Sequence, residues 1–311
     1  AKADLADLYA GARIQSGEGL ATLARKIIPR HAWTDLVLPA DQAAQLREIC
    51  DQARLRHVVY GDWGFDRKLS TGKGLNVLFT GPPGTGKTMA ADVIAGELRL
   101  DLYQIDLSQV VSKYIGETEK NLERIFAAAE NSNAVLFFDE ADALFGKRSD
   151  VKDAHDRFAN IEIGYLLQRM EQHEGVVLLA TNLRQNFDEA FVRRLHSIVE
   201  FPFPDENFRL RIWQAVFPRE APLAAEVDMP FLAREVKMAG GGIKNIALTA
   251  AFYAAADKRA ITMEHIVRAV RREHAKVGRT WEASRSQALP MPFRDAPPHG
   301  GNGRDVGAAG P

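Results

Sequence analysis

The sequence has very little cysteine and no long hydrophobic segment. Only one of its 311 residues, Cys50, is a cysteine. No disulfide can form within the chain, and we therefore expect a reducing, cytoplasmic location. Apolar runs stay well below the roughly 18 residues that a membrane-spanning helix needs. The first residues also do not follow the basic-then-apolar order of a secretory signal. These absences argue against a membrane-embedded or disulfide-stabilised protein.

An excess of charge of one sign is also absent. The chain has 40 Lys and Arg residues against 41 Asp and Glu, a formal net charge of −1. This balance argues against a generally basic surface, which is typical of nucleic-acid-binding proteins. One basic loop, at residues 146–157, contains acidic residues as well. Nucleic acid is an unlikely partner on this composition, although a local basic patch stays compatible with it.

Short apolar runs alternate with helical patterns in the first two thirds of the chain. Because the runs are apolar on both faces, they predict buried parallel strands. The expected class is α/β, a three-layer sandwich with a five-stranded parallel sheet. Asp41 is the expected N-cap of the helix at 41–57. The five runs are 75–80, 102–107, 134–139, 176–181 and 198–203, and the helical patterns between them are 88–99, 117–131 and 155–172.

After Pro204 the strand patterns stop, and four helical patterns follow at 205–216, 228–238, 242–258 and 262–276. They predict a small all-α domain. The last residues are rich in Pro, Gly and Ala and have little to bury, which is typical of a disordered tail. The expected domains are a helical arm or linker at 1–34, a large α/β domain at 35–204, a helical lid at 205–280 and a tail at 281–311.

The first strand leads directly into GPPGTGKT, residues 81–88, and then into a helix. This strand, loop and helix are the context that a phosphate-binding loop requires, which disfavours a chance glycine-rich turn. Glycines let backbone N–H groups turn towards phosphate oxygens. Lys87 supplies a cation to the β- and γ-phosphates, and the hydroxyl of Thr88 is a ligand for Mg²⁺. The predicted nucleotide-binding residues are Gly81, Pro82, Pro83, Gly84, Thr85, Gly86, Lys87, Thr88 and Met89.

Two further strands end in polar residues that a nucleotide site can use. The strand 134–139 runs into DEAD, residues 139–142, and the strand 176–181 is followed by Asn182. Asp139 is the expected Mg²⁺ ligand, and Glu140 is expected to polarise the attacking water. Asn182 is expected to hydrogen-bond that water or the γ-phosphate. An Asp-Glu pair alone is weak evidence, but a phosphate-binding loop calls for a metal-holding carboxylate on a nearby strand.

Arg193 and Arg194 follow a short helical pattern, just before the last strand. Two interpretations stay open at this point. The pair suits the negative end of a helix dipole, and it also suits arginine fingers that complete the site of a neighbouring subunit.

In this order, GPPGTGKT, VLFFDEAD, LLATN and the arginine pair resemble the AAA family of ATPases, over residues of about 35–280. The resemblance implies ATP and Mg²⁺ as cofactors and a homo-oligomeric, hexameric ring with ATP at each interface. It also implies that Lys87, Glu140 and Asn182 are catalytic, with Arg193 and Arg194 acting in trans. It places Leu36 and Val37 at the adenine, and Gly240 and Gly241 in the lid segment that faces the nucleotide. The roles of Lys244 and Arg157 stay open, because their spacing differs from the family pattern.

The stretch SKYIGETEK contains Tyr114, Ile115 and Gly116. In the AAA family the loop at this position faces the central pore, so the resemblance implies that these three residues grip a protein client. The alternative is that Tyr114 folds back onto the sheet.

Two narrower resemblances concern the branch of the family. The direct succession RRL is similar to the katanin and spastin branch. DLVLP, WGF, SKYIGETEKNL and VEFPFPDENFR are similar to bacterial ATPases encoded alongside phage-tail-like contractile injection systems.

The leading hypothesis is an ATP-hydrolysing ring motor that remodels, unfolds or disassembles a protein client. The alternatives are a nucleic-acid-associated motor or loader and an ATP-gated assembly scaffold. The sequence identifies neither the client nor an adaptor.

Overall fold

The computed structural model describes residues 24–69, 72–110, 116–130, 132, 134–142, 154–182, 189–276 and 278–281, with the side chains of helix α8 described from residue 162 onward. All structural statements below refer to these residues.

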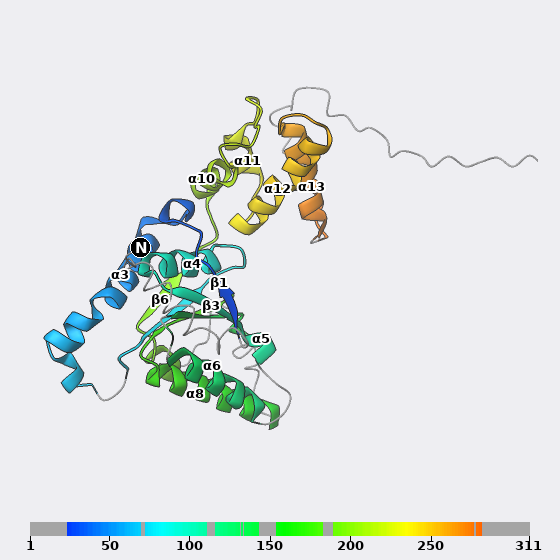
Figure 1. Cartoon of the computed structure of the whole chain (residues 1–311). Helices are drawn as coiled ribbons and strands as arrows, with labels where there is room; N and C mark the ends of the chain where they lie inside the picture. The colour runs from blue at the N-terminus through cyan, green and yellow to red at the C-terminus, as the bar shows by residue number, and fades with distance from the viewer. Residues whose placement is uncertain are drawn as a thin grey trace, which may run out of the picture. The chain divides into compact units, whose positions relative to one another are not determined.

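A six-stranded sheet forms the centre of the first part of the chain, with the strand order β1-β3-β4-β5-β2-β6 (Figure 1). All pairings among β2 to β6 are parallel, which confirms the predicted five-stranded parallel sheet. The strands are β1 Arg25–Ile27, β2 Leu75–Thr80, β3 Asp101–Asp106, β4 Ala134–Asp139, β5 Val176–Thr181 and β6 Ser197–Glu200.

Strand β1 was not predicted, and it lies in the segment 1–34 where a helical arm or linker is expected. β1 adds to the edge of the sheet, antiparallel to β3. The ammonium of Lys26 lies 2.7 Å from the carboxylate of Asp101 and over the ring of Tyr103. These contacts with β3, rather than any local pattern, stabilise the three residues as a strand.

Helices cover both faces of the sheet, as a three-layer sandwich requires (Figure 1). Because side chains alternate along a strand, β2 sends Val77 and Phe79 into one apolar core and Leu78 into the other. Helices α3 Ala40–Arg56 and α4 Lys87–Leu98 contribute to the first core, and α6 Glu117–Glu130 and α8 Ala154–Gln172 to the second. The shorter elements are η1 Trp33–Asp35, η2 His57–Asp62, η3 Phe65–Arg67, α5 Leu107–Val110 and α9 Glu189–Val192.

Helix α3 begins one residue earlier than expected. Its N-cap is Pro39 rather than Asp41. Asp41 lies in the first turn instead. Its carboxylate accepts a hydrogen bond from Gln45 and interacts favourably with the positive end of the helix dipole.

The rest of the chain is helical in the part that the structure describes, with α10 Glu206–Val216, α11 Met229–Glu235, α12 Gly240–Ala256 and α13 Met263–Lys276. The chain divides into two compact units. Among the described residues, one comprises those of 24–220 and 229–245, and the other comprises those of 221–228 and 246–281. By this division α10 and α11 group with the sheet.

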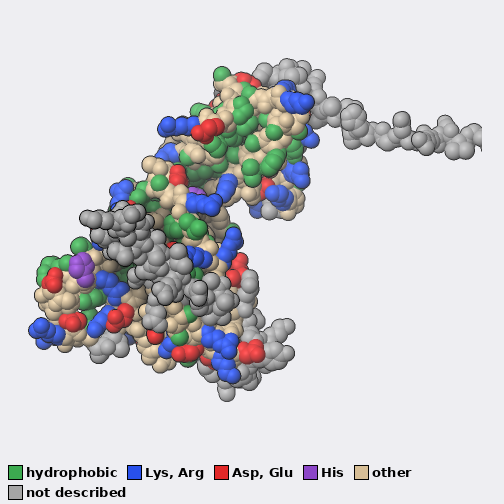
Figure 2. Space-filling view, in the orientation of Figure 1, with side chains coloured by type: hydrophobic (Ala, Val, Ile, Leu, Met, Phe, Trp, Pro, Cys, Tyr) green, Lys and Arg blue, Asp and Glu red, His purple; other side chains and the backbone are tan. Residues whose placement is uncertain are grey.

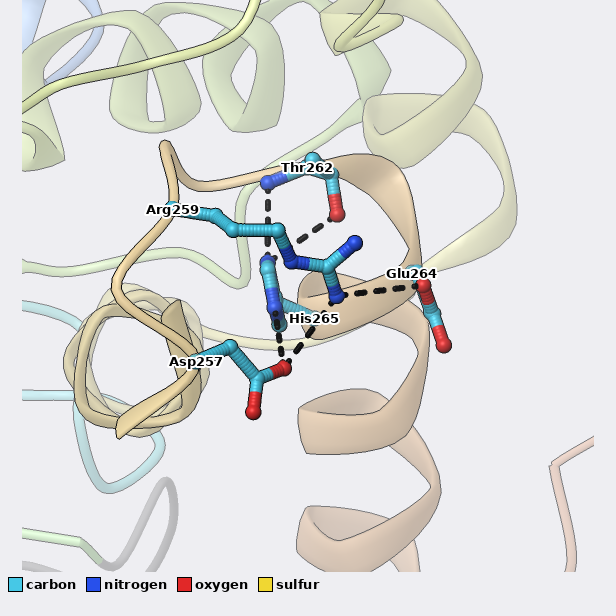
Figure 3. Close-up of polar contacts among 5 residues, drawn as sticks. All are labelled: Asp257, Arg259, Thr262, Glu264 and His265. Carbon is cyan, nitrogen blue, oxygen red and sulfur yellow. Dashed lines mark hydrogen bonds and ion pairs between the residues drawn. The ribbon is translucent and has the colours of Figure 1, made fainter. Parts of the chain in front are cut away.

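In the second unit a histidine connects the loop after α12 to the start of α13 (Figure 3). The imidazole Nδ1 of His265 accepts a hydrogen bond from the backbone N–H of Thr262, 3.1 Å away. Nε2 therefore carries the ring proton, and it lies 3.1 Å from the carboxylate of Asp257. Hydrogen bonds from His265 and Arg259 hold the pKa of Asp257 below its usual value. His265 thereby satisfies the backbone N–H of Thr262 just before α13, which is one half of a capping box.

Helix α12 exposes large apolar side chains, with Leu248 56% and Phe252 68% exposed. Figure 2 shows hydrophobic side chains among Lys and Arg over α12 and α13. No helix among the described residues is long and apolar enough to cross a membrane.

Candidate active site

Three neighbouring strands carry the predicted site residues at their carboxyl ends. The phosphate-binding loop follows β2, Asp139 ends β4, and Asn182 follows β5, which lies between β2 and β4. Parallel strands bring these ends to one edge of the sheet. A cavity of ≈ 680 Å³ lies there, within the first unit. Its walls include the predicted residues Pro83, Gly84, Thr85, Gly86, Lys87, Thr88, Met89, Asp139, Glu140, Asn182, Leu36, Val37, Gly240 and Gly241.

The loop 81–86 adopts a conformation that requires glycine. Gly81, Gly84 and Gly86 have φ angles of 139°, 75° and 106°. A Cβ atom at Gly81 would lie 2.1 Å from the carbonyl oxygen of Phe201. The loop is thereby held against β6, with its backbone turned around the start of α4. This is the cradle that a chain of phosphates fits.

Lys87 is 7% exposed, and its ammonium is fully occupied. It donates to the carbonyls of Gly81 at 2.6 Å and Pro82 at 3.0 Å, and to the side-chain oxygen of Asn182 at 2.9 Å. Burial lowers the pKa of Lys87, and the carboxylates of Asp139 and Asp142 partly oppose this shift. The cation lies between the loop and the polar strand ends, where a phosphate group would need it.

Asp142, the last residue of DEAD, accepts hydrogen bonds that hold Asn182 in place. The carboxylate of Asp142 accepts from the backbone N–H of Asn182 at 2.9 Å, from its side-chain amide at 3.2 Å and from the hydroxyl of Thr181 at 2.8 Å. Burial alone would raise the pKa of Asp142, but these hydrogen bonds outweigh burial and lower it. Asp142 therefore remains a carboxylate, and it fixes which way the amide of Asn182 faces.

The two carboxylates at the end of β4 are arranged differently. Asp139 accepts a hydrogen bond from the side chain of Gln104 on β3, at 2.9 Å, and another from the backbone N–H of Glu140, at 3.0 Å. Glu140 has a φ of 54°, in the left-handed region that residues other than glycine rarely adopt. Such strain is characteristic of active sites, and here it turns the chain sharply after Asp139.

The other end of the cavity is mostly apolar, and both chain segments of the first unit contribute residues to its wall. Leu36, Val37, Gly240 and Gly241 line it as expected, and so does Lys244. The backbone N–H of Gly241, in the first turn of α12, donates to the carbonyl of Gly84 at 2.9 Å, a contact within the first unit. Two polar residues that the sequence did not indicate, His31 and Asp35, also line this end.

The family model described as "ATPase family associated with various cellular activities (AAA)" matches residues 77–203. This range contains the loop, the DEAD carboxylates, Asn182 and the arginine pair. Residues 77–203 form an AAA-family ATPase domain.

Several curated proteins are similar to a larger part of the chain. A 26S proteasome regulatory subunit 6B homolog from Dictyostelium discoideum is 31% identical over 243 residues, covering 76% of this chain and 59% of the relative. Proteasome-activating nucleotidase 1 from Haloferax volcanii is 32% identical over 269 residues, covering 84% and 64%. An uncharacterized AAA family ATPase from Sinorhizobium fredii is 32% identical over 188 residues, covering 60% and 55%. The chain thus spans less than two thirds of the length of these relatives.

Some predicted residues of the AAA domain lie away from the cavity. Gly81 and Pro82 are not part of its lining but accept from Lys87. Arg193 is 72% exposed and pairs with Glu189, and Arg194 pairs with Glu171 at 2.8 Å. Neither arginine lines the cavity of its own chain.

The predicted pore loop is only partly described. Gly116 forms the turn before α6, with a φ of 81°. Tyr114 and Ile115 lie outside the described residues, as does the side chain of Arg157.

The sequence did not single out Asp142 and Gln104, which orient Asn182 and Asp139, or His31, which lines the cavity. Asp142 lies within the quoted motif, and its position one turn after a strand end was the available signal. Gln104 and His31 gave no local signal, because their partners are 35 and 61 residues away along the chain.

Proposed function

We propose that the chain is a Mg²⁺-dependent ATPase that works as a ring-shaped motor on a protein client. The observation that carries the ATPase proposal is the contact between Lys87 and Asn182 beside Asp139 and Glu140, in a cavity formed by a glycine-rich loop. A cation, an oriented amide and two carboxylates at the carboxyl ends of neighbouring strands are the parts that phosphoryl transfer to water requires.

The phosphate-binding step follows from the surroundings of Lys87. Its ammonium now donates to two backbone carbonyls, and phosphate oxygens are stronger acceptors. In the proposed complex Lys87 donates to the β- and γ-phosphates, while the N–H groups of the loop bind the remaining oxygens. The glycine cradle and the buried cation fit a triphosphate, and the start of α4 adds its positive end.

The residues also fit a magnesium ion, although nothing in the chain's own contacts requires one. The hydroxyl of Thr88 and the carboxylate of Asp139 are hard oxygen donors that line the same cavity. When bound there, Mg²⁺ would neutralise phosphate charge. Gln104 fixes the carboxylate of Asp139 from the neighbouring strand, which holds that ligand in place.

For hydrolysis, we propose that Glu140 and Asn182 act on the attacking water. The carboxylate of Glu140 accepts a proton as the water oxygen attacks the γ-phosphorus, and the bond from that phosphorus to the bridging oxygen breaks to leave ADP. Since Asp142 occupies the amide nitrogen of Asn182, the Asn182 oxygen faces the reaction and helps to orient the water.

We further propose that Arg193 and Arg194 complete the site of a neighbouring subunit in a homo-oligomeric, hexameric ring. Both side chains lie outside the cavity of their own chain and reach the surface, as action in trans requires. The exposed Leu248 and Phe252 on α12 are typical of a protein–protein contact. Sizing of the purified protein with and without ATP tests ring assembly, and a monomer under all conditions would contradict it.

The proposed client is a polypeptide, gripped by Tyr114 and Ile115. The support is the sequence resemblance of this loop, together with relatives that are named as proteasome regulatory and proteasome-activating proteins. The test is Tyr114→Ala, which should keep basal ATP hydrolysis and lose client remodelling. Loss of nucleotide binding would instead show that the tyrosine is structural.

Two finer proposals rest on the sequence. The narrower resemblance suggests ATPases that accompany contractile injection systems, and a trapped-client pull-down with Glu140→Gln tests it by identifying the client. A reducing, cytoplasmic location agrees with the single cysteine, whose thiol is buried and whose pKa is raised by that burial to about 12.

A further inference from the structure

His31 is the polar residue whose position at the apolar end of the cavity is least explained by the fold. Its side chain is 41% exposed and lines the cavity that also contains Leu36, Val37 and Met89. It comes from the segment between β1 and η1, which no other predicted function uses. The neighbouring carboxylate of Asp35 already has a structural role, because it accepts from the backbone N–H of Ala32 at 2.8 Å.

Asp92 on α4 fixes the orientation and the tautomer of His31. One oxygen of this carboxylate, which belongs to a residue only 5% exposed, lies 2.7 Å from Nδ1 of His31. The same oxygen accepts the backbone N–H groups of Arg30 and His31, at 3.1 and 2.8 Å. A carboxylate that accepts three hydrogen bonds leaves Nδ1 as the protonated nitrogen of the ring.

In the neutral ring, the other nitrogen, Nε2, then presents a lone pair on the side of the ring away from Asp92. It has no hydrogen-bond partner among the residues that the structure describes. Asp92 lies one helical turn after Met89, so the ring is anchored near the wall of the cavity that Met89 forms. Lys244, which lines the same cavity, can only donate.

We propose that His31 is a specificity-determining residue that reads the base, with Nε2 accepting a hydrogen bond from the exocyclic amino group of adenine. A purine with an oxygen at that position would place two acceptors opposite each other and bind poorly. The inference rests on the proposed function, since it assigns the base end of the same nucleotide site.

The experiment compares three nucleoside diphosphates by calorimetric titration in the presence of Mg²⁺. ADP has the amino group, purine riboside diphosphate has only hydrogen there, and inosine diphosphate has oxygen. The unmodified protein should bind ADP about three- to tenfold more tightly than purine riboside diphosphate, as expected for one neutral hydrogen bond. Inosine diphosphate should bind more weakly still. In His31→Phe the preference for ADP over purine riboside diphosphate should disappear, while the affinity for purine riboside diphosphate is retained.

Asp35→Asn is the matched control, because Asp35 lines the same end of the cavity and should not affect the ratio. If the preference disappears in Asp35→Asn and persists in His31→Phe, the acceptor is Asp35 and our assignment is wrong. Equal affinity of the unmodified protein for ADP and purine riboside diphosphate also contradicts it, whether or not His31→Phe folds. Either result leaves the proposed ATPase intact, whereas failure to bind ADP at all contradicts both proposals.

Discussion

Asp142 determines which atom of Asn182 faces the nucleotide cavity. Its carboxylate lies 3.2 Å from the side-chain nitrogen of Asn182 and 2.9 Å from its backbone nitrogen. The side-chain oxygen is left to accept from Lys87 at 2.9 Å. Asn182 is therefore an oriented acceptor in the cavity wall, and its orientation depends on a carboxylate that does not line the cavity.

Replacing Asp142 by asparagine should slow hydrolysis far more than it weakens binding. Two facing amide nitrogens cannot bond to each other, so Asn182 loses its orientation. Removing a partner that orients a catalytic group typically costs about 10- to 100-fold in activity. We expect kcat to fall by that factor with ATP affinity nearly unchanged. The measurement is steady-state turnover together with equilibrium ATP binding.

Thr181→Val is the control for Asp142→Asn. It removes one of the hydrogen bonds to Asp142 but leaves both bonds to Asn182. A fall in kcat as large as that of Asp142→Asn would show that the effect is structural rather than one of amide orientation.

The strained backbone of Glu140 predicts that removing the strain stabilises the protein but abolishes hydrolysis. Glu140→Gly relieves the positive φ of 54°, and we expect the free energy of unfolding to rise by about 1 kcal/mol, after the entropy cost of glycine, while hydrolysis is lost. Urea denaturation measures the gain. Glu140→Gln keeps a side chain at the same φ, so an equal gain in that variant would exclude strain as the cause.

Gly81 should tolerate no side chain. Its φ of 139° and the 2.1 Å approach of a Cβ atom to the carbonyl oxygen of Phe201 require the loop or β6 to move in Gly81→Ala. We expect loss of nucleotide binding and a lower melting temperature. Gly164 on α8 is the matched control, because a Cβ atom there meets no atom within 4 Å. Gly164→Ala should be neutral or stabilising by up to about 1 kcal/mol. Equal behaviour of the two variants would contradict the structure of the loop.

His173 predicts a loss of stability in mild acid. It is 6% exposed, and neither ring nitrogen has a hydrogen-bond partner in the part of the chain that the structure describes. Burial, followed by the charges of Arg56 and Arg169, lowers its pKa to about 4 from the usual 6.5. The unfolded chain therefore binds more protons between these values. The contribution of His173 to the free energy of unfolding is complete above about pH 6.5. It falls by about 3 kcal/mol as the pH approaches 4.

The measurement is the free energy of unfolding at several pH values between 4.5 and 7, compared with His173→Met. Methionine adapts to irregular space and does not titrate. In this range the free energy of unfolding should change with pH by about 1.4 kcal/mol per pH unit less in the variant than in the unmodified protein. Parallel curves would show that His173 is not buried as a neutral ring.

The parallel sheet and its helices could be predicted because their signals are local. The five apolar runs became β2 to β6 with ends shifted by at most a few residues, and GPPGTGKT formed the expected loop between β2 and α4. Strand β1 could not be predicted, since its three residues become a strand only by pairing with β3.

The cavity was predictable where motifs at the ends of neighbouring strands supply its walls, as with Lys87, Asp139 and Asn182. The groups that orient those side chains were not, because each comes from a strand or helix that only the fold brings near. Asp142 is the instructive case. It lies within DEAD but was not singled out there, and only the pairing of β4 with β5 brings it to Asn182.

The most direct test of the central claim is a paired measurement on Glu140→Gln with Mg²⁺ and ATP. Glutamine keeps the size of the side chain and cannot accept the proton of the attacking water. We expect this variant to bind ATP as tightly as the unmodified protein, while hydrolysis falls to background. Hydrolysis at the unmodified rate would contradict the assigned mechanism.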